Sequence, residues 1–383
     1  MRKFLWYNPI GDFMILKNGY VFTDGSFTKK DISISGKRIS AVGSFNETGE
    51  AIDCTGKYII PGLTDIHTHG CIGYDFSTAS VEEIGKMRRY YLQNGITSIM
   101  ATTVTMSDED IVQAVKNIQL SMKNDSSGTR ILGINLEGPY LSPKKCGAHD
   151  ISLLKKPDID FVNSLGNDIK IVNIAPEYDT SIDFIKKFKG KCSIAHTDCG
   201  YERAKTAIEL GADHITHIFN AMNGLHHREP GVIGAFFDTD AYAEIICDTV
   251  HIAPPVLRMM FAAKPQKLAI ISDSMAAAGL SDGEYTLGKL SVTVKNSIAT
   301  LSDGVLAGSV MNVYNMMKKL ISIGVKKESA VSSSSEIPAK SLGLNREIGR
   351  IAPGCTADMV ITDGEFNIEK IIFEGKQTEA ANR

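Results

Sequence analysis

The sequence has no paired cysteines, no long apolar run and no excess of basic residues, and each absence excludes a class of protein. The seven cysteines are scattered and form no C-x-x-C motif, which argues for a reducing compartment and against a metal site built from thiolates. No window approaches the roughly 18 apolar residues that a membrane-spanning helix needs. The formal net charge of -3 leaves no basic surplus for nucleic acid, so an anionic ligand needs a local positive site.

The N-terminal residues also do not match the pattern expected of a secretory signal sequence. Met1–Tyr7 has a charged start, but Asn8, Pro9 and Gly11 leave the apolar segment too short for such a signal. We therefore expect a cytoplasmic protein that binds neither membranes nor nucleic acid.

The composition that remains is that of a globular protein with more than one module. Hydrophobic residues make up 43%, charged residues 22%, and the mean hydropathy is -0.04. The 383 residues exceed the roughly 250 of a typical (β/α)₈ barrel, so we expect a barrel with a smaller added domain.

The two ends of the chain have a β-rich pattern. Residues 15–52 are short strands and turns, with period-two alternation over Asp31–Ser35. Strand patterns return at 357–362 and 368–373. We predict a small discontinuous β-sandwich domain from residues 1–58 plus 350–383, and a barrel domain from residues 59–349.

Between these ends, apolar strands alternate with amphipathic segments. Eight such strands at about thirty-residue spacing indicate a parallel (β/α)₈ TIM-type barrel in the α/β class. We predict helices at 81–93, 111–123 and 201–210, then a hairpin-like insertion at 288–302 and helices at 309–323 and 327–334. The predicted strands are 60–66, 96–102, 131–137, 170–175, 192–197, 213–218, 243–248 and 268–273.

Polar residues recur where these strands end, which is where barrel enzymes place their active sites. Each residue alone could be a satisfied turn or cap residue, but six at the same barrel end indicate a site. All six are nitrogen or carboxylate donors, which favours Zn²⁺, Fe²⁺, Mn²⁺ or a related divalent ion. They are His67, His69, Glu137, His196, His217 and Asp273. By contrast, His214 falls on the opposite strand face, and His226 and His227 fall in a loop.

Six motifs give the chain a family resemblance over nearly its whole length. They are Leu136–Pro139, Gly147–His149, Ala195–His196, Thr216–Met222, Arg228–Gly231 and Leu306–Ser309. With these motifs the chain resembles the N-acetylglucosamine-6-phosphate deacetylases of the amidohydrolase superfamily. The resemblance implies hydrolysis of the acetamide of N-acetyl-D-glucosamine 6-phosphate, a phosphorylated amino sugar, to D-glucosamine 6-phosphate and acetate, by a homodimer.

The resemblance also implies roles for particular residues. Glu137, His196 and His217 would bind the principal metal, Zn or Fe with Mn, Co and Ni as further possibilities, and His67 and His69 permit a second ion. Asp273 would act as general base and then acid, and His149 would contact the acetamide carbonyl or a sugar hydroxyl. The implied substrate-binding residues are Ala148, His149, Asn220, Ala221, Arg228, His251, Leu306, Ala307, Gly308 and Ser309.

These residue types suit amide hydrolysis. A divalent ion held by one carboxylate and two imidazoles can lower the pKa of bound water from 15.7 toward about 7. Asp273 could take the proton of that water and deliver it to the glucosamine nitrogen. Arg228 offers a planar fork of donors suited to the phosphate, although a loop arginine can equally pair with a surface acid.

Two other functions remain open. The first is another amidohydrolase, such as a deacylase of amino acids or a cyclic amidase, but many binuclear members use a carboxylated lysine after strand 4. Here strand 4 ends Ile174–Glu177, with no lysine. The second is a non-catalytic barrel relative that works in binding or assembly, which we would expect to have lost ligands.

Overall fold

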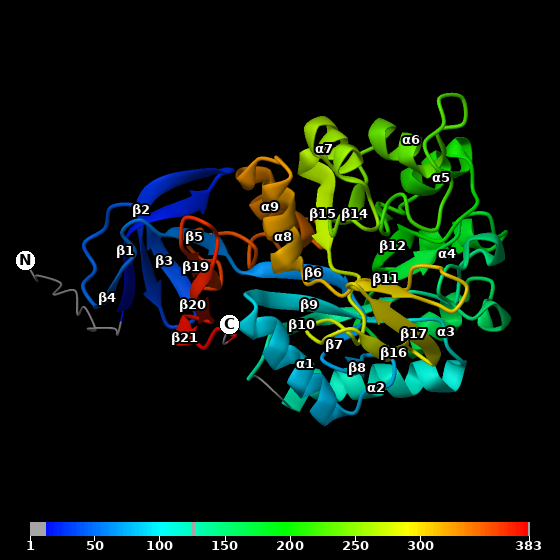
Figure 1. Ribbon diagram of the computed structural model, residues 1–383, viewed down its shortest axis with the longest axis horizontal. Helices are drawn as coiled ribbons and strands as arrows, with labels where there is room; N and C mark the ends of the chain where they lie inside the picture. Colours follow the sequence, from blue (N-terminus) through cyan, green and yellow to red (C-terminus); the bar gives the residue numbers. More distant parts are fainter. Residues whose placement is uncertain (1–12, 125–126, 382–383) are drawn as a thin grey trace, which may run out of the picture.

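The computed structural model describes residues 13–124 and 127–381. The predictions for residues 1–12 and 382–383, including the N-terminal segment and both ends of the small domain, lie outside these residues. A β-rich part that contains both described ends of the chain lies at one end of the molecule, beside a larger α/β part (Figure 1). None of the helices in the described residues combines the length and apolarity needed to cross a membrane.

The larger part is the predicted parallel barrel. Its strands are hydrogen-bonded in the order β15-β14-β13-β12-β11-β10-β9-β6. The barrel closes between its first and last strands, where the Asp273 N–H donates to His67 O (2.9 Å) and the His69 N–H donates to Ser274 O (2.8 Å). The strands are β6 (Leu63–Thr68), β9 (Ile96–Thr103), β10 (Arg130–Leu136), β11 (Ile169–Ile174), β12 (Lys191–Ile194), β13 (His214–Ile215), β14 (Tyr242–Ile246) and β15 (Leu268–Ile271).

Helices follow the strands and cover the barrel (Figure 1). The first begins where Ser80 and Glu83 form a capping box, and its buried face follows the predicted amphipathic pattern. The α-helices are α1 (Val81–Gln93), α2 (Asp108–Asn124), α3 (Ile159–Ser164), α4 (Ser181–Lys187), α5 (Tyr201–Glu209), α6 (Gly231–Asp238), α7 (Pro254–Ala263), α8 (Val313–Ser322), α9 (Lys327–Ser334) and α10 (Glu336–Ser341). Short 3₁₀ turns are η1 (Pro143–Lys145), η2 (Ile151–Leu153) and η3 (Pro265–Lys267).

Four strand predictions run two or three residues too far. The strands predicted to end at 197, 218, 248 and 273 end at Ile194, Ile215, Ile246 and Ile271. In three of them the backbone turns at the polar residue that follows. His196, His217 and Asp273 have φ angles of +42°, +24° and +46°, which no β-strand contains. In these three strands, the backbone therefore leaves the extended conformation at the polar residue.

Other boundaries differ for local reasons. The predicted strand 60–66 is two strands, β5 (Tyr58–Pro61) and β6, separated at Gly62, where a Cβ would lie 2.3 Å from Thr97 Oγ1. The helix predicted from Ser309 starts only at Val313, because Asn312 caps it by accepting from the Asn315 N–H.

The predicted hairpin-like insertion is a three-stranded antiparallel sheet. Its strands are β16 (Gly283–Leu287), β17 (Leu290–Lys295) and β18 (Ile298–Thr300), so it begins before the predicted residue 288. A second small hairpin, β7 (Gly70–Cys71) and β8 (Tyr74–Asp75), directly follows the first barrel strand.

The small part combines strands from both ends of the chain, as predicted. Its strand order is β21-β20-β19-β5-β1-β2-β3, with β4 paired to β1. The sheet has a core of its own that includes Leu16, Ile32 and Met359, and the Ile39 N–H of β3 donates to Cys355 O (3.0 Å) in the segment before β19. The strands are β1 (Phe13–Thr23), β2 (Ser26–Ser35), β3 (Arg38–Val42), β4 (Glu50–Asp53), β5, β19 (Met359–Thr362), β20 (Ile368–Phe373) and β21 (Lys376–Thr378).

Arg130, at the start of β10, ties the barrel to the C-terminal strands. Its guanidinium contacts Asp358 (3.0 Å), Glu374 (3.2 Å) and the hydroxyl of Ser98 (3.1 Å). The side chain of Asp358 is only 3% exposed, and burial raises its pKa although Arg130 opposes the shift. Asp358 therefore depends on Arg130 for the compensation of a buried charge.

We predict that Arg130→Ala lowers the free energy of unfolding by about 3 kcal/mol, because it leaves the Asp358 carboxylate buried without its cation. Urea unfolding followed by circular dichroism measures the change. The control is Lys37→Ala, which removes an ion pair to Glu374 from a lysine whose side chain is 70% exposed. That change should cost less than about 1 kcal/mol. Equal losses in the two variants would contradict the role of Arg130.

Candidate metal centre and active site

A cavity of about 370 Å³ opens at the C-terminal ends of the barrel strands. Strand-end residues form its floor, while loop residues and the β16–β18 insertion form its sides. The lining residues are His69, Glu137, Lys145, Gly147, Ala148, His149, His196, His217, Asn220, Ala221, His251, Asp273, Leu287, Val305, Leu306 and Gly308. Most residues singled out in the sequence therefore meet in one place.

Glu137, His196 and His217 form the first of two ligand groups. Glu137 directly follows β10, and its Oε1 lies 3.2 Å from His196 Nε2 and 2.9 Å from His217 Nε2. The two imidazole Nε2 atoms are 3.1 Å apart. All three side chains are buried. One carboxylate oxygen and two imidazole nitrogens thus face a single point.

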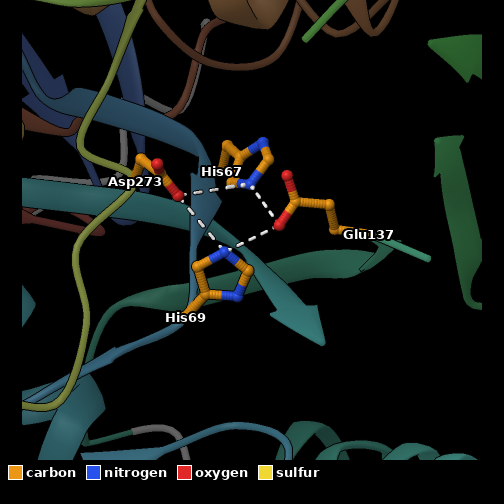
Figure 2. Close-up of side chains that lie close together, drawn as sticks. All are labelled: His67, His69, Glu137 and Asp273. Carbon is orange, nitrogen blue, oxygen red and sulfur yellow. Dashed lines mark ion pairs between the residues drawn. The ribbon is translucent and has the colours of Figure 1, made fainter. Parts of the chain in front are cut away.

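His67, His69, Glu137 and Asp273 form the second group, and Figure 2 shows their side chains converging. We call it the strand-1 group, because its two histidines lie at the end of β6, the first strand of the barrel. The other oxygen of Glu137, Oε2, lies 3.0 Å from His69 Nε2 and 3.5 Å from His67 Nε2. Asp273 Oδ1 lies 3.2 Å and 3.5 Å from the same two nitrogens. Glu137 belongs to both groups, with one oxygen directed to each.

The donor set fits divalent metal ions at both groups. The candidate ligand atoms within each group lie within 4.8 Å of one another, and all belong to buried histidines or carboxylates. His67 Nε2 is buried and has no hydrogen-bond partner among the described residues. A buried nitrogen that faces two carboxylates without a hydrogen bond is the arrangement expected of a ligand to a cation.

The pKa shifts describe how the site balances its charge. Burial lowers the pKa of His196 to about 4, so this imidazole is neutral near pH 7 and can act as a ligand. For His69, Asp273 and Glu137 outweigh the opposing effect of burial and raise the pKa to about 9. Burial would raise the pKa of Glu137, but His67 and the surrounding histidines hold it well below its usual value. The carboxylates of the pocket therefore favour positive charge at His67 and His69.

Buried partners fix the rings of two histidines on the side away from Glu137. His67 Nδ1 lies 2.8 Å from Glu244 Oε2, and His196 Nδ1 lies 2.8 Å from the carbonyl oxygen of Lys145. In each ring the Nδ1 position is occupied as a donor, which leaves Nε2 to face the Glu137 carboxylate.

His149 is held in a defined tautomer. Its Nδ1 accepts a hydrogen bond from the backbone N–H of Thr105 (3.2 Å). A neutral imidazole that accepts at Nδ1 carries its proton at Nε2, and this atom lies 3.5 Å from Glu137 Oε2. His149 therefore presents an N–H donor beside the ligand groups.

The sugar side of the cavity is formed by loops. His251 is oriented by Asp248, whose Oδ2 lies 2.7 Å from His251 Nδ1. Asn220 and Ala221 follow the turn after β13, where Ala221 has a φ of +51°. Leu306 and Gly308 reach the cavity from the segment after β18.

Ala307 and Ser309 do not line the cavity but hold its wall. The Ser309 N–H donates to Asp273 O (2.7 Å), and the Ser309 hydroxyl donates to Ser272 O (2.6 Å). Ala307 is fully buried, and its N–H donates to Ala299 O. The φ of Gly308 is +67°, and a Cβ there would lie 2.8 Å from Asp273 O. This segment therefore fixes the backbone of Asp273.

Arg228 lies outside the cavity of its own chain. It is exposed and lines a separate hollow with Tyr201, Asn223 and His226. The structure thus does not bring Arg228 together with Glu137 and the histidines. His214, expected outside the site, is buried against Asp213 (2.9 Å), and His227 is exposed.

Sequence reasoning missed several residues of the site. Glu244 could have been noticed, because it is the one charged residue in the buried run Ala243–Ile246, and Asp248 precedes His251 by three positions. Lys145 and Thr105 contact the histidines through a backbone carbonyl and a backbone N–H, which a pattern of side chains cannot predict.

Comparisons with known proteins agree with this geometry. The model of the Amidohydrolase family matches residues 58–379. The N-acetylglucosamine-6-phosphate deacetylase of Bacillus subtilis is 36% identical, covering 94% of this chain and 93% of its own. That of Vibrio furnissii is 33% identical, covering 88% of each chain.

The fold agrees as well. A mutant of the Mycobacterium smegmatis N-acetyl-D-glucosamine-6-phosphate deacetylase, solved in complex with N-acetyl-D-glucosamine-6-phosphate, has a TM-score of 0.89 at 29% identity. The match covers 97% of this chain and 100% of that one. These matches confirm the resemblance carried by the sequence motifs. The chain belongs to the amidohydrolase family.

Proposed function

We propose that this protein removes the acetyl group of N-acetyl-D-glucosamine 6-phosphate by metal-dependent hydrolysis, with D-glucosamine 6-phosphate and acetate as products. The observation that carries the proposal is the pair of buried ligand groups that share Glu137 and have Asp273 and His149 beside them. The relatives of Bacillus subtilis and Vibrio furnissii, named for this activity, support the choice of substrate.

Glu137, His196 and His217 would hold the principal ion, and His67 and His69 would hold a second one with Glu137 and Asp273. Nitrogen and carboxylate donors favour Zn or Fe, with Mn, Co and Ni as further possibilities. When bound, such an ion lowers the pKa of water and polarises a carbonyl oxygen. The remaining steps belong to side chains of the chain itself.

Asp273 is the proton carrier. It lies at the end of β15, where the Ser309 N–H holds its carbonyl oxygen, and it is 8% exposed. His69 and His67 keep its pKa below the usual value against the effect of burial, so its carboxylate is ready to accept a proton. It takes the proton of the attacking water and delivers it to the departing glucosamine nitrogen.

His149 stabilises the oxyanion. Because the Thr105 N–H occupies Nδ1, the Nε2–H is the group that can donate to the acetamide oxygen as negative charge develops there. The donor is in place before the reaction, so no reorganisation is needed in the transition state.

The sugar would lie between Ala148, His251 and the Asn220–Ala221 turn, against Leu306 and Gly308. Since Arg228 is exposed and outside its own cavity, we infer that it reaches the phosphate of a second subunit in a homodimer. The seven free cysteines favour the reducing cytoplasm as the compartment.

The direct test is acetate release by purified protein. We expect chelator-stripped protein to be inactive and to regain activity with Zn²⁺, Fe²⁺ or Mn²⁺. It should release acetate from N-acetyl-D-glucosamine 6-phosphate far faster than from N-acetyl-D-glucosamine, since the phosphate contributes binding energy. Absence of acetate with all three ions would contradict the proposed function.

We predict that Asp273→Asn lowers turnover at least ~10²-fold, because the amide cannot accept the proton of water. It should still bind the principal ion, since Glu137, His196 and His217 remain. Acetate assays and elemental analysis measure the two quantities. The matched control is Asp240→Asn at a side chain that is 95% exposed. Near-normal turnover in Asp273→Asn would remove Asp273 from the reaction.

We predict that replacing His67 by Gln together with His69 by Asn lowers the metal stoichiometry by one ion without emptying the site. The principal group, Glu137, His196 and His217, contains neither residue. Elemental analysis after equilibration with Zn²⁺ measures the stoichiometry, and the paired replacement of the exposed His226 and His227 is the control. A variant that bound no metal would make the strand-1 pair the principal site.

A further inference from the structure

Glu244 is a buried acidic residue that the proposed reaction does not use. It lies on β14 within the buried run Ala243–Ile246 and is 1% exposed. Removing a carboxylate from water costs several kcal/mol unless other charges compensate it. A bare packing role does not explain a carboxylate here, because an apolar residue would fill the space at lower cost.

The contact that Glu244 makes crosses the interior of the barrel. Its Oε2 lies 2.8 Å from Nδ1 of His67, which stands on β6. In the strand order, β15 lies between β14 and the first strand, so the two residues do not face each other across one ladder. Its second oxygen, Oε1, has no hydrogen-bond partner among the described residues. Glu244 is thus directed at His67.

This contact determines which nitrogen of His67 faces Glu137 and Asp273. With Nδ1–H donating to Glu244, Nε2 keeps its lone pair and points between Glu137 Oε2 and Asp273 Oδ1, at 3.5 Å from each. Both distances are too long for a hydrogen bond. A carboxylate behind an imidazole also makes the opposite nitrogen a stronger ligand.

The two ligand groups differ in what stands behind them. The ring of His196 donates to a neutral carbonyl, that of Lys145, whereas the ring of His67 donates to a carboxylate. The strand-1 group therefore has three carboxylates around it, from Glu137, Asp273 and Glu244. This difference gives the strand-1 group the larger negative charge.

We propose that Glu244 is the positioning residue of the strand-1 metal site: it orients His67 and supplies the negative charge that lets this group hold a second ion. Within the described residues, the Glu244 side chain makes its hydrogen bond to His67 and none to the principal group of Glu137, His196 and His217. The inference rests on the proposed function only in taking the site to bind metal, and it makes this chain a binder of two ions.

The test is Zn²⁺ titration of chelator-stripped protein against a chromophoric chelator, with elemental analysis of the saturated protein. The parent protein should bind two ions. Glu244→Gln keeps the shape but removes the charge, and should weaken the second ion about 10- to 100-fold while leaving the first unchanged. Glu244→Leu, which also removes the acceptor, should do so at least as strongly. The control is Glu209→Gln, an exposed glutamate on α5 outside the cavity.

A double-mutant cycle separates positioning from a general structural role. If Glu244 acts through His67, adding Glu244→Gln to His67→Gln should change the residual affinity of the strand-1 site for its ion less than twofold. Unchanged binding of two ions in both Glu244 variants would overturn the proposal, and so would equal weakening of both ions. A parent protein that binds one Zn²⁺ at saturation also overturns it.

The outcome is independent of substrate. A parent protein that binds two ions but releases no acetate would contradict the proposed function and leave the role of Glu244 standing.

Discussion

The shared carboxylate of Glu137 is the interaction on which the site depends. Its two oxygens face different histidine groups, His196 and His217 on one side and His67 and His69 on the other. A carboxylate can serve both groups only if it is fixed in one position, and Glu137 is fixed because it directly follows β10 in a fully buried setting. All strand-end residues are then placed relative to this one side chain.

The backbone at the strand ends explains how the ligands reach it. His196, His217 and Asp273 all have positive φ angles, a conformation that non-glycine residues rarely adopt. Such strain persists where the surroundings determine it, and here hydrogen bonds do so. The Asp273 N–H donates to His67 O, and its carbonyl accepts from the Ser309 N–H. The contacts that close the barrel therefore also fix the position of Asp273, the proposed proton carrier.

Much of the fold and of the candidate site could be predicted from the sequence. Periodicity predicts the barrel strands, and the active site of such a barrel lies at their C-terminal ends. The eight strands, the two-ended small sheet and the gathering of the six strand-end donors follow from patterns that side chains carry. The exact strand ends could not be predicted, since a positive φ at His196 is set by tertiary contacts and leaves no periodic signal. Sequence reasoning missed Glu244 for a related reason. In β14 it is one polar residue in an apolar run, and its role depends on a contact with His67, which is far from it in the sequence.

The cavity combines residues from strand ends with residues from loops, and this division affects substrate specificity. The ligand groups come from strand ends, which the barrel holds rigid, whereas the other walls of the cavity come from segments between strands. Leu287 and Val305 belong to the insertion around β16–β18, and Ala221 belongs to the loop after β13. These segments can change without disturbing Glu137, so one ligand arrangement can serve different acyl substrates. The motifs Gly147–His149 and Thr216–Met222 thus carry more information about substrate than His67 and His69 at the end of β6, whose proposed role is only to hold a cation.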